Sequence, residues 1–177
     1  MLLPSALGLL RGAYPQLDID LALNDGPVDL VTEGVDISFR QGPAGDGAFH
    51  ASRLGEVERL LVASPAYVAR HAPIESPSDL IIHTFVRVKT MFGTEHLPLV
   101  DASAQRENVA MRSAITTNHW KAMYQMTKDG LGIGVLDAFA CADAIAAGTL
   151  VTLLPPYRVP PQELHLLTRA QRPVPAR

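Results

Sequence analysis

Apolar and polar positions change period repeatedly along the chain, and these changes predict alternating helices and strands. The first segment follows the helical repeat of a core-facing amphipathic helix, which Tyr14-Pro15 ends. Strict alternation of apolar and polar residues then predicts a strand over residues 17–23. The apolar stripe of the leading helix consists of Leu2, Leu3, Ala6, Leu10 and Ala13.

The next stretch contains a helix start, a helix stop and a glycine-rich run. Asn24 and Asp25 precede a proline, a combination that is typical of the first turn of a helix. Gly34 is placed to end that helix. We therefore expect a short helix over residues 28–33, a strand over 35–39 and a surface loop over 41–47.

The remainder of the chain continues the alternation of helices and strands. Ser64 is expected to cap a helix over residues 66–71, and residues 76–79 form a capping box. Residues 117–118 are expected to cap a helix that Gly130 ends. Asp137 caps a last helix over 138–147, and an exposed hairpin with a short strand near 97–100 occupies 89–107. Further strands are predicted over 53–63, 84–88, 109–117, 133–136, 150–154 and 163–168, which favours an α/β architecture with largely parallel sheets.

Composition and charge limit the class of protein. The 177 residues are 47% hydrophobic and 19% charged, which favours a sizeable folded core over disorder. The net charge of −3 provides no clustered basic face for nucleic acid. The apolar start has no positive segment before it and is interrupted by Pro4, which argues against a signal peptide. No apolar run reaches the ~20 residues that cross a bilayer, so we expect a soluble cytoplasmic protein.

Common catalytic and metal-binding patterns are missing from the sequence. It has no Gly-x-Ser-x-Gly elbow and no Cys-x-x-Cys, and its six histidines are never three or four residues apart. The glycines of residues 130–134 lack the strand and helix of a dinucleotide loop, so we interpret them as a helix stop with tight packing. Cys141 lies in an alanine-rich helical run that favours a small buried residue over a reactive thiol. We expect no catalytic residue, no metal and no cofactor.

Six segments form one ordered pattern along the chain. The most specific are Val-Asp-Leu-Val-x-Glu-Gly-x-Asp-x-x-x-Arg at residues 28–40 and Val-Ala-Ser-Pro-x-Tyr at residues 62–67. The others are Tyr14-Pro15, residues 77–83, residues 130–133 and residues 146–155. In this order the segments closely resemble the effector-binding domain of LysR-type transcriptional regulators.

The resemblance implies a type 2 periplasmic-binding-protein-like fold, with two α/β lobes and a ligand cleft between them. Lobe I would comprise residues 1–63 and 158–177, and lobe II residues 64–157. The resemblance also implies a small-molecule sensor that forms a homodimer and reaches DNA only through an N-terminal winged helix-turn-helix that this sequence lacks. The family's first strand and closing helix are not matched here either, so we expect one wall of the site to be incomplete.

Candidate ligand contacts lie beyond the carboxyl ends of the predicted strands, where ligands bind in open α/β sheets. Arg40 can bind a carboxylate with its planar fork, or can form a structural salt bridge to Asp36 or Asp46. Both alternatives are open from the sequence. The candidate set is Asn24, Asp25, Arg40, Gln41, Gly42, Ser64, Pro65, Thr84, Phe85, Thr117, Asn118, His119 and Leu136. The same criterion selects Asp137, which directly follows Leu136.

Besides Arg40, three candidates have an ordinary structural role as an alternative to ligand binding. Asn24 and Asp25 are expected to be helix caps first and ligand contacts second. His119 lies at a predicted helix start, where exposed amides favour anions, and it can equally be a helix-start histidine half in solvent.

Three classes of protein are compatible with this fold. The leading hypothesis is a non-catalytic sensor of a small organic anion, most plausibly a carboxylate. The alternatives are an extracytoplasmic solute-binding protein and an enzyme, such as the transferases that share a bilobal architecture. The lack of a signal peptide counts against the first alternative, and the lack of a nucleophile–base pair counts against the second.

Overall fold

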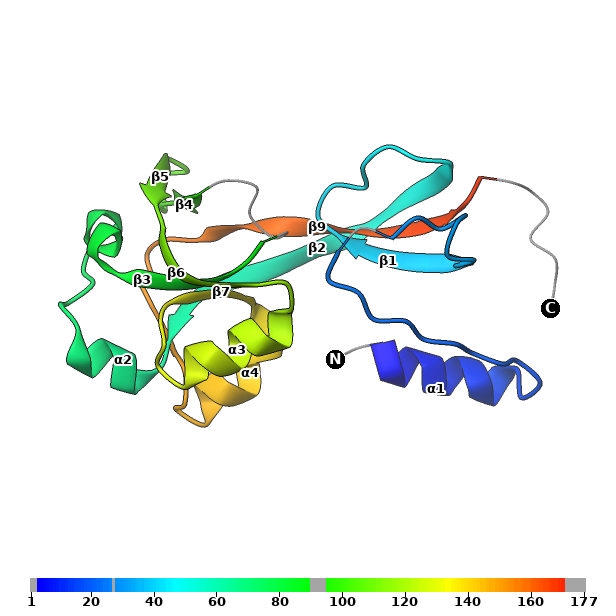
Figure 1. Ribbon diagram of the computed structural model, residues 1–177, viewed down its shortest axis with the longest axis horizontal. Coiled ribbons are helices and arrows are strands. Elements are labelled where there is room, and N and C mark those ends of the chain that lie inside the picture. The colour runs from blue at the N-terminus through cyan, green and yellow to red at the C-terminus, as the bar shows by residue number, and fades with distance from the viewer. Residues whose placement is uncertain (1–2, 27, 90–94, 171–177) are drawn as a thin grey trace.

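Two long antiparallel strands run the length of the molecule (Figure 1) in the computed structural model, which describes residues 3–26, 28–89 and 95–170. These strands are β2 (Phe49–Ala63) and β9 (Val159–Arg169). β1 (Ile37–Gln41) pairs with β9 near one end of the molecule. β7 (Gly134–Asp137) and β8 (Val151–Thr152) pair with β2 near the other. We call residues 3–48 the β1 end and residues 64–157 the β7 end.

The β7 end extends the sheet by two parallel strands. β3 (Thr84–Val88) lies parallel to β6 (Arg112–Thr117), and a bridge between Phe85 and Ile133 joins β3 to β7. The helix α3 (Trp120–Lys128) connects β6 to β7, which lie on either side of β3. The other elements here are α2 (Pro65–Arg70), the 3-10 helix η1 (Pro77–Ile82), α4 (Ala138–Ala146), β4 (His96–Val100) and β5 (Arg106–Ala110).

The expectation of largely parallel sheets is wrong. The pairs β1–β9, β2–β9, β2–β7, β2–β8 and β4–β5 are antiparallel, and among the described strands only β3 and β6 form a parallel ladder. β2 and β9 cross the molecule in opposite directions, and each strand that joins them runs against its neighbour. Alternation of helices and strands in a sequence does not reveal strand direction, which is why the prediction failed.

The local signals of the β7 end are largely confirmed. Ser64 caps α2, because its hydroxyl accepts a hydrogen bond from the Tyr67 amide at 3.2 Å. The capping box of Ser76 and Asp79 is present at the start of η1. The predicted strand over residues 109–117 is divided at Met111 into β5 and β6. The hairpin formed by β4 and β5 is only partly exposed, since alternate side chains of β4 are buried.

The described apolar core lies mainly at the β7 end. One cluster surrounds Tyr67, Phe85 and Ile133 and takes in the β4 side chains Leu97 and Leu99. The second cluster lies between α3, α4 and the sheet, with Val62, Val86, Val88, Met123, Leu136, Cys141, Ala144 and Leu150 as its buried members. The expectation for Cys141 is confirmed, since its side chain is buried and burial raises the pKa of its thiol.

The glycines after α3 are explained by a helix stop and by close packing. Gly130 has a φ of +78° and ends α3. A Cβ on Gly132 would lie 2.8 Å from the Thr84 carbonyl oxygen, and one on Gly134 would lie 2.5 Å from Thr127 Oγ1. These contacts confirm the packing interpretation of residues 130–134.

The leading helix forms where it was predicted but is not buried. It spans Leu3–Ala13 as α1 and lies apart from the sheet at the β1 end (Figure 1). On its expected core-facing stripe, Ala6 and Ala13 are exposed and Leu10 is 39% exposed, so the core-facing prediction is wrong. The Arg11 guanidinium donates to the Leu17 carbonyl and thereby ties α1 to the segment that follows.

The predicted strand over residues 17–23 does not form. The segment has no strand assignment, and the alternating side chains Ile19, Leu21 and Leu23 are 37%, 46% and 68% exposed. A strand is stabilised by ladder hydrogen bonds and cross-strand contacts, and the described residues supply no partner strand for this segment. Apolar and polar side chains do alternate over residues 17–23, but a strand also needs a neighbouring strand to pair with.

The predicted helix over residues 28–33 is a single turn. The Glu33 amide bonds to the Asp29 carbonyl at 3.0 Å, and Gly34 ends the turn with a φ of +69°. Its cap is Asp29, whose carboxylate accepts from the Val31 and Thr32 amides at 2.9 and 3.2 Å. These bonds, that of Thr32 first, lower the pKa of Asp29. The expected caps Asn24 and Asp25 therefore do not serve this turn.

Gly132→Ala is expected to lower the free energy of unfolding by about 1–3 kcal/mol, because the added methyl group meets a backbone oxygen that cannot move aside. Urea titration followed by circular dichroism measures the change. Gly8→Ala in α1 is the matched control, since nothing lies within 4 Å of its Cβ position. Equal stability of Gly132→Ala and the parent would contradict the packing role.

Candidate functional site

A carboxylate of the β1 end binds the first turn of a helix at the β7 end. Asp25 Oδ2 accepts a hydrogen bond from the Trp120 amide at 2.7 Å, although the two residues are 95 positions apart. Trp120 is the first residue of α3, where a helix leaves its amides without partners of its own. The positive end of the helix dipole adds a favourable interaction with the charge of Asp25.

The cap of α3 is one residue later than expected. His119 occupies the N-cap position, and its Nδ1 accepts from the Lys121 amide at 3.2 Å. Thr117 Oγ1 accepts from the His119 amide at 3.1 Å, and Asn118 is exposed. His119 Nδ1 lies 3.9 Å from Asp25 Oδ2. The start of α3 therefore combines a histidine cap with a carboxylate from another part of the chain.

A second polar contact joins the two ends through Gln41. Its Nε2 donates to Asp137 Oδ1 at 2.8 Å and to Gln162 Oε1 at 3.0 Å. Asp137 is the N-cap residue of α4, as expected, but its carboxylate makes no capping bond. Burial raises the pKa of Asp137, and the hydrogen bond from Gln41 and the charge of Arg59 partly offset this effect.

Arg59 lies beside this cluster, in the ladder between β2 and β7. It is 7% exposed and pairs with Asp137 in the strand register. Its Nε and Nη2 both donate to the Pro160 carbonyl, at 3.0 and 2.7 Å. Burial lowers the pKa of Arg59, an effect that the charge of Asp137 opposes. A buried cation, a carboxyl group and two amide side chains thus meet where four strands converge.

Arg40 supports the backbone around it. Its Nη1 donates to the Ala44 carbonyl at 2.5 Å and its Nη2 to the Val28 carbonyl at 3.1 Å. The guanidinium also lies over the Phe49 ring, with its central carbon 5.8 Å from the ring centroid. Asp36, one of its two expected partners, pairs with Arg169 at 3.5 Å. The guanidinium therefore connects the turn before β1 to the loop after it.

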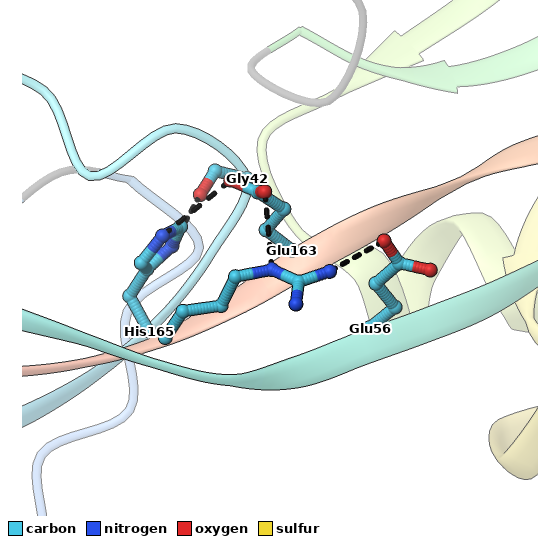
Figure 2. Close-up of polar contacts among 5 residues, drawn as sticks. Gly42, Glu56, Glu163 and His165 are labelled. Carbon is cyan, nitrogen blue, oxygen red and sulfur yellow. Dashed lines mark hydrogen bonds and ion pairs between the residues drawn. The ribbon is translucent and has the colours of Figure 1, made fainter.

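Gly42 is fixed by β9, as Figure 2 shows. It is buried, its amide donates to the Glu163 carbonyl at 2.8 Å, and His165 Nδ1 lies 3.1 Å from its carbonyl oxygen. Beside this contact, the Arg53 guanidinium of β2 reaches Glu56 on the same strand at 2.6 Å and Glu163 of β9 at 3.1 Å. Gly42 has a φ of +92°, which favours glycine at this position.

The remaining candidates separate into three groups. Ser64 and Thr84 lie around Tyr67, whose hydroxyl accepts from the Thr84 amide at 3.1 Å and lies 3.2 Å from His83 Nδ1. Phe85 and Leu136 are each 1% exposed and belong to the two core clusters. Asn24 and Pro65 are exposed. Of the candidates, the structure therefore brings together Asp25 with His119 and, separately, Gln41 with Asp137.

Sequence reasoning missed two residues of these contacts, because Arg59 and Gln162 were not candidates. Asp137 was selected together with Leu136, since it lies at the end of a strand, where ligand sites form. Gln162 carried no such signal, since only the pairing of β9 places it beside Gln41.

The described residues contain neither a metal-binding cluster nor a membrane-spanning helix. Residues 3–26, 28–89 and 95–170 contain no group of three or more His, Cys, Asp or Glu side chains that could hold a metal ion. In the same ranges no helix combines the length and the apolarity needed to cross a membrane.

Comparison with known proteins identifies the class and then the family. The architecture is a type 2 periplasmic-binding-protein-like α/β fold, shared with the regulatory domain of CrgA from Neisseria meningitidis (TM-score 0.80, 22% identity, 96% of this chain and 82% of that one). The regulatory domain of AphB from Vibrio vulnificus is also similar (TM-score 0.74, 26% identity, 97% and 85%). Residues 1–177 match the LysR substrate binding domain, and the chain belongs to that family.

The similar full-length proteins are transcriptional regulators. PtxR of Pseudomonas aeruginosa is 31% identical over 164 residues, which cover 93% of this chain and 52% of that protein. DmlR of Escherichia coli is 31% identical over 160 residues, which cover 89% and 51%. The chain thus spans about half the length of these relatives. The resemblance drawn from six sequence segments is confirmed.

Asp137→Asn is expected to stabilise the fold increasingly as pH rises. Burial raises the pKa of Asp137 above 3.8, so the parent loses stability as pH increases from 3.8 through the raised value. Asparagine cannot ionise and keeps an oxygen that accepts from Gln41. Urea unfolding from about pH 4 to 7 measures the difference between variant and parent. The exposed Asp143→Asn in α4 is the control, and a difference for Asp137→Asn that does not change with pH would contradict this account.

Proposed function

We propose that this chain is the effector-sensing part of a LysR-type transcriptional regulator. The match to the LysR substrate binding domain over residues 1–177 carries the proposal. The regulator reaches DNA through an N-terminal winged helix-turn-helix, in keeping with relatives that are about twice as long and are named as helix-turn-helix regulators. A regulator of this kind acts on chromosomal DNA, so we place it in the cytoplasm and assign it no enzymatic activity.

We propose that the two ends of the molecule are its two lobes. Lobe I comprises residues 1–63 and 158–177, and lobe II residues 64–157. The long strands β2 and β9 support this division, because they run through both ends and carry the other sheet strands on either side (Figure 1). A ligand between the lobes can alter their relative orientation only by its difference in affinity for the two arrangements.

We propose that the effector is a small organic anion, most plausibly a carboxylate. Its contacts are Arg40 on lobe I and residues 117–119 at the start of α3 on lobe II. Two observations support this assignment. The α3 start binds a carboxylate in the structure, namely that of Asp25. Arg40 lies in the same lobe as Asp25, and it is hydrogen-bonded to the carbonyl of Val28, three residues after Asp25.

Removal of these contacts is expected to weaken effector binding. Arg40→Ala and Asn118→Ala should each lower affinity for the best carboxylate of a metabolite panel by about ten- to hundredfold, the effect of losing a charge-assisted hydrogen bond. Isothermal titration calorimetry measures the affinity. Asp20→Ala, an exposed change in the extended segment, is the control. Unchanged affinity in both variants would show that the ligand binds elsewhere.

We propose that the chain forms a homodimer in which α1 contributes Leu7 or Leu9. Leu9 is 78% exposed on a helix that the sheet does not cover, and exposed apolar surface of this kind favours association. Leu9→Asp is expected to shift the protein towards monomer in analytical ultracentrifugation. Ile82→Asp is the control, because Ile82 is 65% exposed in η1 at the β7 end. The same monomer mass for parent and Leu9→Asp would contradict the proposal.

A further inference from the structure

Asp25 places a charged side chain where the proposed effector would bind. Its Oδ2 lies 2.7 Å from the Trp120 nitrogen, and its side chain is 21% exposed although the neighbouring Asn24 and Gly26 are exposed. Through this carboxylate, the extended segment of the β1 end contacts the β7 end. Among the α3 amides, that of Trp120 is bound by Asp25 and that of Lys121 by the His119 ring.

An incoming carboxylate and Asp25 cannot bind the Trp120 amide together. One N–H group makes one strong hydrogen bond, and two carboxylates at this distance repel each other. We propose that the contact between Asp25 and Trp120 is a latch, and that an anionic effector binds α3 by displacing Asp25. This inference rests on the proposed function and adds to it the step that couples binding to movement.

Displacement of Asp25 can affect lobe I through the hydrogen bonds that join the following segment to Arg40. Val28 follows it closely in the chain, and the Val28 carbonyl accepts from Arg40 Nη2 at 3.1 Å. The same guanidinium holds the Ala44 carbonyl through Nη1, so it joins both sides of β1. Release of Asp25 therefore loosens the segment whose other contacts position Arg40, the proposed second ligand contact. The hydrogen bond between Gln41 and Asp137 does not involve this segment and still joins the two ends.

The latch makes a prediction that needs no knowledge of the natural effector. Acetate is the probe, and the backbone amides of Trp120 and Lys121 report on it by nuclear magnetic resonance of the isotope-labelled chain. Asp25→Ala is expected to bind acetate at these amides about tenfold or more tightly than the parent, because the internal competitor is gone. The Trp120 amide should also exchange its hydrogen faster in the variant without acetate.

Two further variants keep the test interpretable. Asp25→Asn retains an oxygen acceptor but not the charge, so its acetate affinity should lie between those of the parent and Asp25→Ala. It also provides a folded variant if the alanine substitution disturbs the segment. Asp20→Ala should behave as the parent. Equal acetate affinity in the parent, Asp25→Ala and Asp25→Asn would overturn the latch, as would a Trp120 amide that exchanges at the same rate in all three.

The outcome for the latch is distinct from the outcome for the proposed function. If removal of Asp25 strengthens acetate binding while no metabolite carboxylate binds the parent, the latch is supported and the proposed carboxylate effector is contradicted. If a metabolite binds the parent and Asp25→Ala with equal affinity at the α3 start, the sensor function stands and the latch is overturned.

Discussion

The antiparallel ladder between β2 and β9 is the interaction on which the rest of the molecule depends. Its register runs from Phe49 opposite Arg169 to Arg59 opposite Val159, with irregularities at Arg53/Gly55 and Val57/Arg59. β1 joins this ladder through β9, whereas β7 and β8 join it through β2. The β7 end is also joined to the start of β9, through the bridge between Val100 and Arg158. The ladder therefore supports both ends and connects them.

The two ends are stabilised in different ways. Apolar clusters hold the β7 end together, and burial of such side chains is the main source of folding free energy. At the β1 end, many large apolar side chains are exposed and the described contacts of the extended segment are polar. Regions with few buried apolar contacts open at low free-energy cost, so the β1 end is expected to open more readily than the β7 end.

Local chemistry explains which features could be predicted. Ser64, the Ser76 capping box and Gly130 act through neighbours within a few residues, so their patterns reported the structure directly. The strand over 17–23 failed because a ladder needs a partner that sequence alternation cannot supply. Asp25 failed as a local cap because it binds a helix 95 residues away, and that contact depends on the complete fold.

The most direct test of this account is the distance between the two ends in solution. Spin labels at Asp20→Cys and Asp143→Cys, both exposed positions, report it by pulsed electron resonance. If Asp25 and Gln41 hold the ends together on the β2–β9 ladder, Asp25→Ala combined with Gln41→Ala should broaden the distance distribution and shift its maximum. The same narrow distribution in the parent and the double variant would contradict the account.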